Sequence, residues 1–186
     1  ACLVGSEMCI RDSSIISFLA TISITIEARN DTPVAYALTL ETPEDTSLNI
    51  DLSATDVDHN IFSYSDFSFI ITQIDICGTL QDPSNPYQDI SVVSGPYTLL
   101  SHRVVYIPHE DFNGSNGFSY HVIDVSGVSS EDVSVNIIVE ARNDTPVAFT
   151  LTEITPEDIS LTIDLSASDV DHDTFSYSDF SFVITS

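Results

Sequence analysis

Two short acidic motifs, Asp56-Val-Asp58 and Asp169-Val-Asp171, carry the side chains of this sequence that are best suited to chemistry. Each motif follows a segment that alternates like a strand, and continued alternation would place both carboxylates on one side of the chain, a few ångströms apart. Two carboxylates about 4 Å apart repel each other by roughly 4 kcal/mol at an effective dielectric constant of about 20, so a site that gathers several of them needs a cation. Ca²⁺ is the natural candidate, because it binds about six to eight oxygen ligands in flexible geometry.

The same motifs allow other interpretations. An EF-hand loop that begins at Asp56 would need Gly at its sixth position and Glu at its twelfth, but Ile61 and Phe67 stand there, and the second motif fails in the same way. His59 and His172 follow the two motifs, yet no second His or Cys stands at the spacing of a zinc site. Asp and Asn are also common in turns, where they hydrogen-bond the nearby backbone. A role as solvated turn residues therefore stays open for each of these acids.

Both motifs belong to a long internal repeat. Residues 27–72 return at residues 140–185 with 36 identical positions out of 46, at a period of 113 residues. Residues 3–13 do not match the rest and look like a translated sequencing adaptor, so we expect residues 1–13 to be non-native. The period then predicts the last strand of a preceding repeat at 14–29, a complete repeat at 30–142 and the truncated start of the next repeat at 143–186. Arrays of this kind usually supply length, spacing or multivalency.

The composition is strongly acidic. The chain has 29 Asp and Glu residues against 4 Lys and Arg residues, a formal net charge of −25 at pH 7. This balance argues against nucleic acid and anionic membrane surfaces as partners, since both are bound through Lys and Arg. No apolar run is long enough for a membrane-spanning helix, so direct membrane insertion is not expected. We expect a folded protein that is secreted or displayed at the cell surface, in a calcium-bearing medium, with Cys77 buried in its core.

Alternation with period two predicts strands along the repeat. Apolar and polar side chains alternate through residues 48–52, 118–123 and 133–139, and no segment shows a convincing helical period. Turn signals rich in Pro, Gly, Asn and Asp separate these segments. Six to eight short strands in about 100 residues indicate an all-β Greek-key sandwich, and a repeat of this size can bury enough surface to fold.

Six motifs, in this order, resemble the tandem cadherin-like (Ig-like β-sandwich) repeats of large bacterial surface proteins and adhesins: Asn30-Asp-Thr-Pro-Val-Ala, Thr42-Pro-Glu-Asp-Thr, Leu52-Ser-Ala-Thr-Asp-Val-Asp, Val105-Tyr-Ile-Pro, Asp111-Phe-Asn-Gly-Ser and Phe118-Ser-Tyr-His-Val-Ile-Asp. The resemblance covers the complete repeat, the start of the next and the last strand of the one before. It implies a calcium-binding structural or adhesive repeat of a long extracellular protein. Ca²⁺ between neighbouring repeats would stiffen the array.

The resemblance also implies metal ligands at the two junctions between repeats. The junction near residue 142 would collect oxygens from the complete repeat, the linker and the following repeat: Glu44, Asp111, Glu140, Asn143, Asp144, Asp169 and Asp171. The upstream junction would use Glu27, Asn30, Asp31, Asp56, Asp58 and Asp124. An arginine replaces one potential ligand in each linker, so we expect one or two ions at a junction. For Asp111 a turn-capping role stays equally open.

Residues 73–100 are longer than the corresponding segment of that family and carry Cys77, Tyr87 and Tyr97. If this segment forms a contact surface, the repeat is a module that binds cell-surface glycans or proteins. A third alternative is an accessory region of a secreted enzyme whose catalytic domain lies elsewhere. Nothing in the sequence resembles a nucleophile elbow or a coherent triad, so the chain itself is not expected to be an enzyme.

Overall fold

The computed structural model describes residues 6–8, 11–12, 15–16, 20–58, 63–85, 88–172, 176 and 178–185. The chain forms two units, Ala1–Asp31 and Thr32–Ser186, which are described separately. In the first unit β1 (Ser6–Met8) pairs antiparallel with β4 (Ala20–Ile22), and β2 (Arg11–Asp12) pairs antiparallel with β3 (Ile15–Ile16). Residues 23–31 are assigned to no strand. The division of the chain into repeats stays a prediction.

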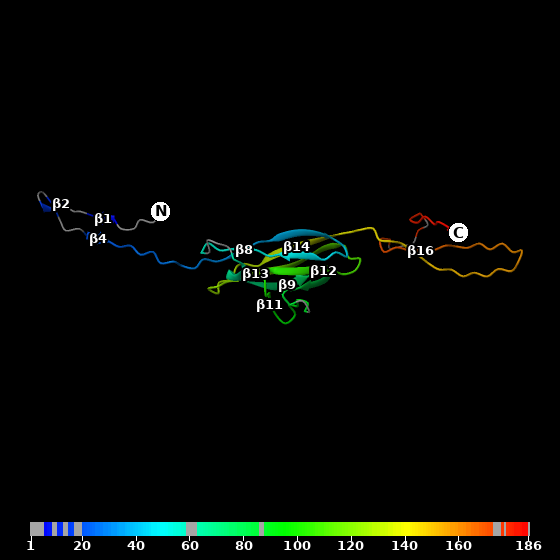
Figure 1. Cartoon of the computed structure of the whole chain (residues 1–186), viewed down its shortest axis with the longest axis horizontal. Helices are drawn as coiled ribbons and strands as arrows, with labels where there is room; N and C mark the ends of the chain where they lie inside the picture. Colours follow the sequence, from blue (N-terminus) through cyan, green and yellow to red (C-terminus); the bar gives the residue numbers. More distant parts are fainter. Residues whose placement is uncertain are drawn as a thin grey trace. The chain divides into compact units, whose positions relative to one another are not determined.

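The second unit contains an all-β sandwich (Figure 1). The larger sheet has the order β11–β9–β13–β14–β6, from β6 (Leu38–Pro43), β9 (Phe67–Asp75), β11 (Tyr97–Thr98), β13 (Gly114–Asp124) and β14 (Val133–Glu140). The smaller sheet has the order β10–β12–β7, from β7 (Leu48–Asp51), β10 (Gly78–Gln81) and β12 (Arg103–Pro108). The pair β5 (Val34–Ala35) and β8 (Ala54–Thr55) completes this repeat. The predicted all-β sandwich is therefore confirmed.

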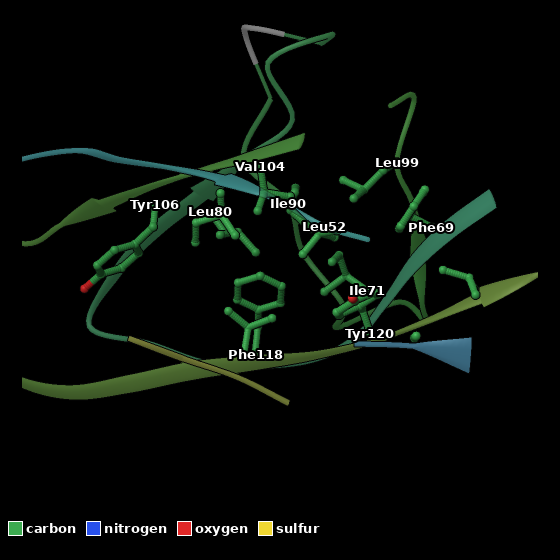
Figure 2. Packing of buried hydrophobic residues seen from close by; sticks show 14 of the residues in the cluster. Leu52, Phe69, Ile71, Leu80, Ile90, Leu99, Val104, Tyr106, Phe118 and Tyr120 are labelled. Atoms are coloured by element: carbon green, nitrogen blue, oxygen red, sulfur yellow. The ribbon is translucent and has the colours of Figure 1, made fainter. Parts of the chain in front are cut away.

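Period-two alternation places the core between the two sheets. Along β13, Phe118, Tyr120 and Val122 are buried while their neighbours are half-buried, as the sequence predicts. Figure 2 shows Phe118 and Tyr120 in the space between the strands, with Leu52, Leu80 and Val104 from the other side. Full burial of an aliphatic or aromatic side chain stabilises the fold by about 1.5–3 kcal/mol. The core of the sandwich thus follows from the alternation alone.

One helical turn occurs in the described part of the chain, the 3-10 helix η1 (Tyr64–Asp66) before β9. None of the described residues belongs to a helix that is long and apolar enough to cross a membrane. Beyond residue 142 the described strands are β15 (Val147–Ala148) and β16 (Ala167–Ser168), which pair antiparallel. Several large apolar side chains of this region are exposed, including Phe149 and Ile163.

The predicted burial of Cys77 is wrong, because its side chain is exposed. Cys77 lies in the turn between β9 and β10, just before Gly78 at φ +146°. A side chain at Gly78, the first residue of β10, would collide with the backbone carbonyl of Ile107, so glycine is required where the chain leaves this turn and passes close to β12. The backbone of Cys77 is held inside, since its N–H donates to Asn116 Oδ1 at 2.6 Å and its carbonyl accepts from the Tyr106 hydroxyl at 2.9 Å. The thiol therefore points away from the core.

Candidate metal centre

Two groups of three carboxylates meet at the end of the sandwich that adjoins residue 142. Glu44, Asp144 and Asp171 form one group, and Asp45, Asp111 and Asp144 form the other. In each group one oxygen of every residue lies within 4.8 Å of the others. Asp144 belongs to both groups and links them into one acidic centre of five residues.

The parallel pairing of β6 with β14 positions the first of these acids. Pro43 lies opposite Glu140 at the end of the ladder, and the Glu44 amide donates to the Glu140 carbonyl at 2.9 Å. Glu44 itself is buried, at 5 % exposure, and one of its carboxylate oxygens accepts a hydrogen bond from the Arg142 amide. The end of β6 thus holds Glu44 against the segment that follows β14.

Two turns supply Asp45 and Asp111, two members of the second group. Asp45 and Asp111 both have left-handed backbones, with φ of 57° and 58°, a conformation that Asp tolerates better than most residues. The Asp111 amide donates to Asp45 Oδ1 at 3.1 Å, which joins the turn after β6 to the turn before β13. An open groove lined in part by Asp111, Asp144 and Asp169 leads to this centre.

The linker acid Asp144 reaches across to the following segment. Its amide donates to Asp171 Oδ2 at 2.7 Å, and the Asp171 amide donates to Asp169 Oδ1 at 3.0 Å. Asp144 Oδ2 is buried and has no hydrogen-bond partner within the part of the chain that the structure describes. A buried anionic oxygen without a donor is costly, and a bound cation would satisfy it.

The electrostatics of the centre disfavour the bare anions. Burial raises the pKa of the Asp144 carboxyl above 3.8, and the carboxylates of Asp111, Asp171, Glu44 and Asp45 raise the pKa further. All the donors are hard oxygens, which suits Ca²⁺ or Mg²⁺, whereas zinc sites usually include His or Cys. The acidic centre could therefore hold a divalent cation.

A family model for the bacterial Ig domain matches residues 30–137. The chain belongs to this family. Two solved structures are also similar: the sialic acid binding region of the Streptococcus sanguinis SK1 adhesin bound to 3'sLn, at 12% identity and TM-score 0.36 over 76% of this chain and 40% of that one; and the Clostridium thermocellum CbhA fibronectin(III)-like modules, at 17% identity and TM-score 0.28 over 68% of this chain and 55% of that one.

This bacterial Ig chain thus spans about half or less of each of those two structures. A search of curated proteins finds no significant match. The family match agrees with the sandwich and with the coarser part of the sequence resemblance, an Ig-like bacterial repeat.

The acidic centre brings together four of the seven ligands predicted for the junction near residue 142: Glu44, Asp111, Asp144 and Asp171. The other three lie outside both groups, and their role as ligands stays a prediction. Glu140 is 3.8 Å from the Arg142 guanidinium, the Asn143 amide side chain donates to the Asp144 carbonyl at 2.8 Å, and Asp169 accepts from the Asp171 amide.

Asp45 is the ligand candidate that the sequence analysis missed. It stands inside the repeated Thr-Pro-Glu-Asp motif, so its recurrence at Asp158 was a usable signal. Asp158 also has a positive φ, of 60°. The left-handed backbone favours Asp at both of these positions.

The upstream junction of this Ig domain stays a prediction. Three of its predicted ligands, Glu27, Asn30 and Asp31, belong to the first unit, and the other three belong to the second. The expectation that alternation aligns the acids of each Asp-Val-Asp motif is wrong, because β8 ends at Thr55 and residues 57–58 form a turn. Asp56 Oδ1 instead accepts from the Asp58 amide at 2.8 Å, as in an Asx turn. His59 and Tyr87 lie outside the described residues.

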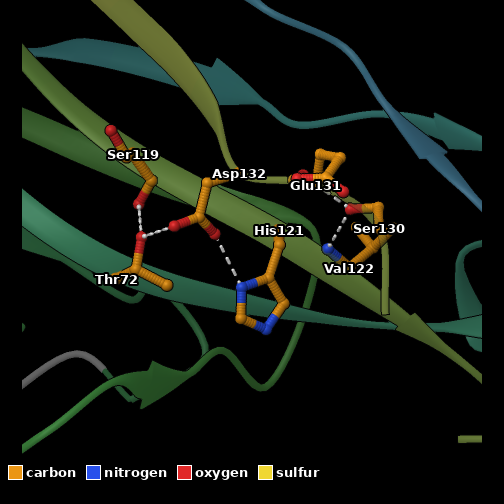
Figure 3. Close-up of polar contacts among 7 residues, drawn as sticks. All are labelled: Thr72, Ser119, His121, Val122, Ser130, Glu131 and Asp132. Atoms are coloured by element: carbon orange, nitrogen blue, oxygen red, sulfur yellow. Dashed lines mark hydrogen bonds and ion pairs between the residues drawn. The ribbon is translucent and has the colours of Figure 1, made fainter. Parts of the chain in front are cut away.

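A second polar cluster lies on the outer face of the larger sheet and combines the residue types of a catalytic triad (Figure 3). Asp132 accepts from the Thr72 hydroxyl at 3.3 Å and lies 2.8 Å from His121 Nδ1. The order is therefore hydroxyl, carboxylate, imidazole, whereas activation of a nucleophile needs the imidazole beside the hydroxyl. The Thr72 hydroxyl is also within 3.4 Å of the Ser119 carbonyl, so the cluster ties strands of the sheet together.

The long segment between β9 and β12 is fastened to the Ig sandwich by Asp82. This carboxylate is fully buried and accepts from the amides of Ser84 and Leu100, each at 2.8 Å. Tyr97 lies in β11, at the edge of the larger sheet. Asp82 therefore has a structural role in closing the segment.

Proposed function

We propose that this bacterial Ig domain is a structural or adhesive repeat of a long secreted or cell-surface protein. Ca²⁺ bound at the acidic centre near residue 142 joins it to the segment that follows, residues 143–186. The cation would bridge the turns of the complete repeat, the linker and the Asp-Val-Asp turn of the next repeat.

One observation carries this proposal: Asp144, a linker residue, belongs to both carboxylate groups, and its Oδ2 is buried without a hydrogen-bond partner among the described residues. The two groups draw on Glu44, Asp45 and Asp111 on one side of the linker and on Asp171 on the other. A site of this composition depends on the alignment of two consecutive repeats, because neither side alone supplies all its oxygens.

Ca²⁺ would stabilise the junction by mass action. It binds the aligned carboxylates and not the separated ones, so occupancy favours the aligned linker. Affinities of extracellular calcium modules are on the order of 10⁻⁴ to 10⁻³ M. At 100 times the dissociation constant an ion adds about 2.7 kcal/mol to stability. The junction would therefore be stiff in a calcium-rich medium and loose after chelation.

The test compares wild-type chain with two variants that each lose one negative charge. Asp144→Asn removes the shared ligand, and Glu131→Gln removes an exposed charge outside the acidic centre. We expect millimolar Ca²⁺ to raise the Tm and reduce the small-angle scattering dimensions of wild type and Glu131→Gln, and EDTA to reverse both changes. Asp144→Asn should not respond.

If the melting curve and the scattering profile of wild type are the same in Ca²⁺ and in EDTA, the calcium proposal is wrong. An equal response of Asp144→Asn and Glu131→Gln would show that Ca²⁺ acts only by screening the net charge of −25. Glycan or protein binding through residues 73–100 has less support, because the Asp82 carboxylate accepts hydrogen bonds from the amides of Ser84 and Leu100 and so holds that segment together. The accessory role in a secreted enzyme stays an alternative for the longer protein.

A further inference from the structure

Two strands of the larger sheet, β6 and β14, lie side by side and run in the same direction. They pair in parallel from Leu38 opposite Val135 to Pro43 opposite Glu140. β6 is the edge strand of this sheet, and β14 is the strand next to it. The hydrogen bonds of this one parallel ladder therefore hold β6 in the larger sheet.

The chain enters the ladder at one end and leaves it at the other. It enters β6 at Leu38, and it leaves β14 at Glu140, beside the far end of β6. A pull on the segments before β6 and after β14 thus draws the two strands in opposite directions along their common axis. All bonds of the ladder are loaded together in this geometry, because they are evenly spaced and run between the strands.

A buried side chain fastens the end at which the chain enters β6. Just before this strand, the Tyr36 amide donates to the Ser53 carbonyl at 3.2 Å. The Tyr36 carbonyl accepts from the Tyr120 hydroxyl at 2.7 Å, and the same hydroxyl lies 3.0 Å from the Ser53 carbonyl. Tyr120 is fully buried and belongs to β13, the strand on the far side of β14. The backbone before β6 is thus tied to the middle of the sheet.

A second buried side chain fastens the end at which the chain leaves β14. Glu44 directly follows β6, and its amide donates to the Glu140 carbonyl at 2.9 Å. The Glu44 carboxylate accepts from the Arg142 amide, and the residue is only 5 % exposed. These two bonds continue the ladder past its last residue pair, into the segment that follows β14.

We propose that the β6–β14 ladder is a mechanical clamp by which the sandwich carries tension along the chain, and that Tyr120 and Glu44 anchor its two ends. The inference rests on the proposed role as a structural or adhesive repeat, which is loaded when its protein is pulled, but it does not rest on Ca²⁺. Sheared bonds must break together, whereas bonds peeled from one end break one at a time. Forced unfolding follows the rate of unfolding, so this strength differs from equilibrium stability.

The test pulls the full chain in two directions by single-molecule force spectroscopy. Ala28→Cys with Thr145→Cys places the handles before β6 and after β14, so tension shears the ladder. Ala28→Cys with Ser126→Cys places the second handle in the exposed turn before β14, at the same end of the ladder as Leu38, so tension peels it. All measurements are made in EDTA, so a failure of the calcium proposal does not change the outcome. Three native cysteines are first changed to Ser: Cys2, Cys9 and Cys77.

We expect the rupture force to be at least about twofold higher in the shearing direction than in the peeling direction at the same loading rate, since the bonds share the load only in shear. The three introduced cysteines replace exposed residues outside the core. The two proteins therefore differ chiefly in the direction of the load. Equal rupture forces in the two directions would overturn the clamp.

Two substitutions test the anchors. Tyr120→Phe should lower the rupture force in both directions, because the entry of β6 is loaded in both. Glu44→Ala should lower it in the shearing direction only, because peeling begins at the opposite end of the ladder. Leu80→Ala is the control, since Leu80 is buried in β10 of the smaller sheet, outside the ladder. This variant should lose Tm through its cavity and yet keep more of its shearing force than either anchor variant.

The anchor variants separate a mechanical role from a merely stabilising one. If rupture force simply follows Tm across the three variants, Tyr120 and Glu44 are not anchors of a clamp. If Glu44→Ala lowers the peeling force as much as the shearing force, its bond to the Arg142 amide does not act at one end of the ladder, and the proposal is wrong. The comparison of the two pulling directions uses no core substitution, so it holds even where an anchor variant fails to fold.

Discussion

Asp171 accepts a hydrogen bond from the backbone amide of Asp144 at 2.7 Å across 27 positions of sequence, while the carboxylates of the same two residues face each other with Glu44. The hydrogen bond attracts the two residues, whereas their carboxylates repel each other. The amide fixes the linker to the Asp-Val-Asp turn, and the crowded anions oppose that arrangement. A divalent cation would remove the opposition and leave the hydrogen bond in place.

The two roles of Asp171 can be separated by substitution. Asp171→Asn keeps an oxygen that accepts from the Asp144 amide but loses the charge, so we expect calcium affinity to fall by at least about tenfold, or about 1.4 kcal/mol. Without calcium the same variant should be at least as stable as wild type, because one repulsion is gone. Calcium titration followed by thermal unfolding measures both effects. Glu131→Gln is the control, since it removes one exposed charge outside the acidic centre. Asp132→Asn would be a poor control, because Asp132 contacts His121.

Because of His102, we expect the folded protein to lose stability at mildly acidic pH. Desolvation by burial lowers the pKa of His102 below 6.5, partly offset by the Asp51 carboxylate and reinforced by the Arg103 charge. The folded protein therefore binds this proton less readily than the unfolded chain. The stability that neutral His102 contributes is fully present above pH 6.5. It is lost as the pH falls through the lowered pKa of His102 in the folded protein.

The measurement compares wild type with His102→Gln between about pH 5 and pH 7.5, a range that brackets an ordinary histidine pKa. The Tm of wild type should fall more on acidification than that of the variant, since the two proteins differ only at residue 102. Parallel curves for the two proteins would contradict the prediction.

The next prediction concerns the Tyr120 hydroxyl, which links β13 to the backbone near the start of the sandwich. Its hydroxyl, on a fully buried side chain, donates toward the carbonyls of Tyr36 at 2.7 Å and Ser53 at 3.0 Å. Tyr120→Phe should lower the free energy of unfolding by about 1–3 kcal/mol, because the donor is lost while its acceptors stay buried. Denaturant unfolding measures this, with the half-buried Tyr97→Phe as the matched control.

How much of this structure could be predicted from the sequence depends on the range of each interaction. Alternation is local, so the buried faces of Phe118, Tyr120 and Val122 were predictable and are confirmed. The burial of Cys77 was inferred from residue type, and the turn at Gly78 overrides it. A pattern of types does not show where a turn directs one side chain.

The acidic centre illustrates the same limit. The resemblance to cadherin-like repeats implied Glu44 and Asp144 at the junction, but the contact of Asp45 with Asp111 joins turns 66 residues apart. Its geometry depends on a left-handed backbone at both residues. Only the folded sandwich brings those turns together, so their pairing could not be predicted from spacing along the chain.

The last prediction concerns two neighbouring residues of β14 whose side chains lie on opposite faces of the strand. Ile137 is fully buried between the sheets, and Ile138, the next residue, is 40% exposed on the outer face. Ile137→Ala removes apolar contacts and leaves a cavity, which costs about 2–5 kcal/mol. Ile138→Ala should cost less than about 1 kcal/mol, since it alters only strand propensity and partly exposed surface. Equal losses of the two variants in denaturant unfolding would mean that both side chains are buried, and would place β14 inside a larger assembly.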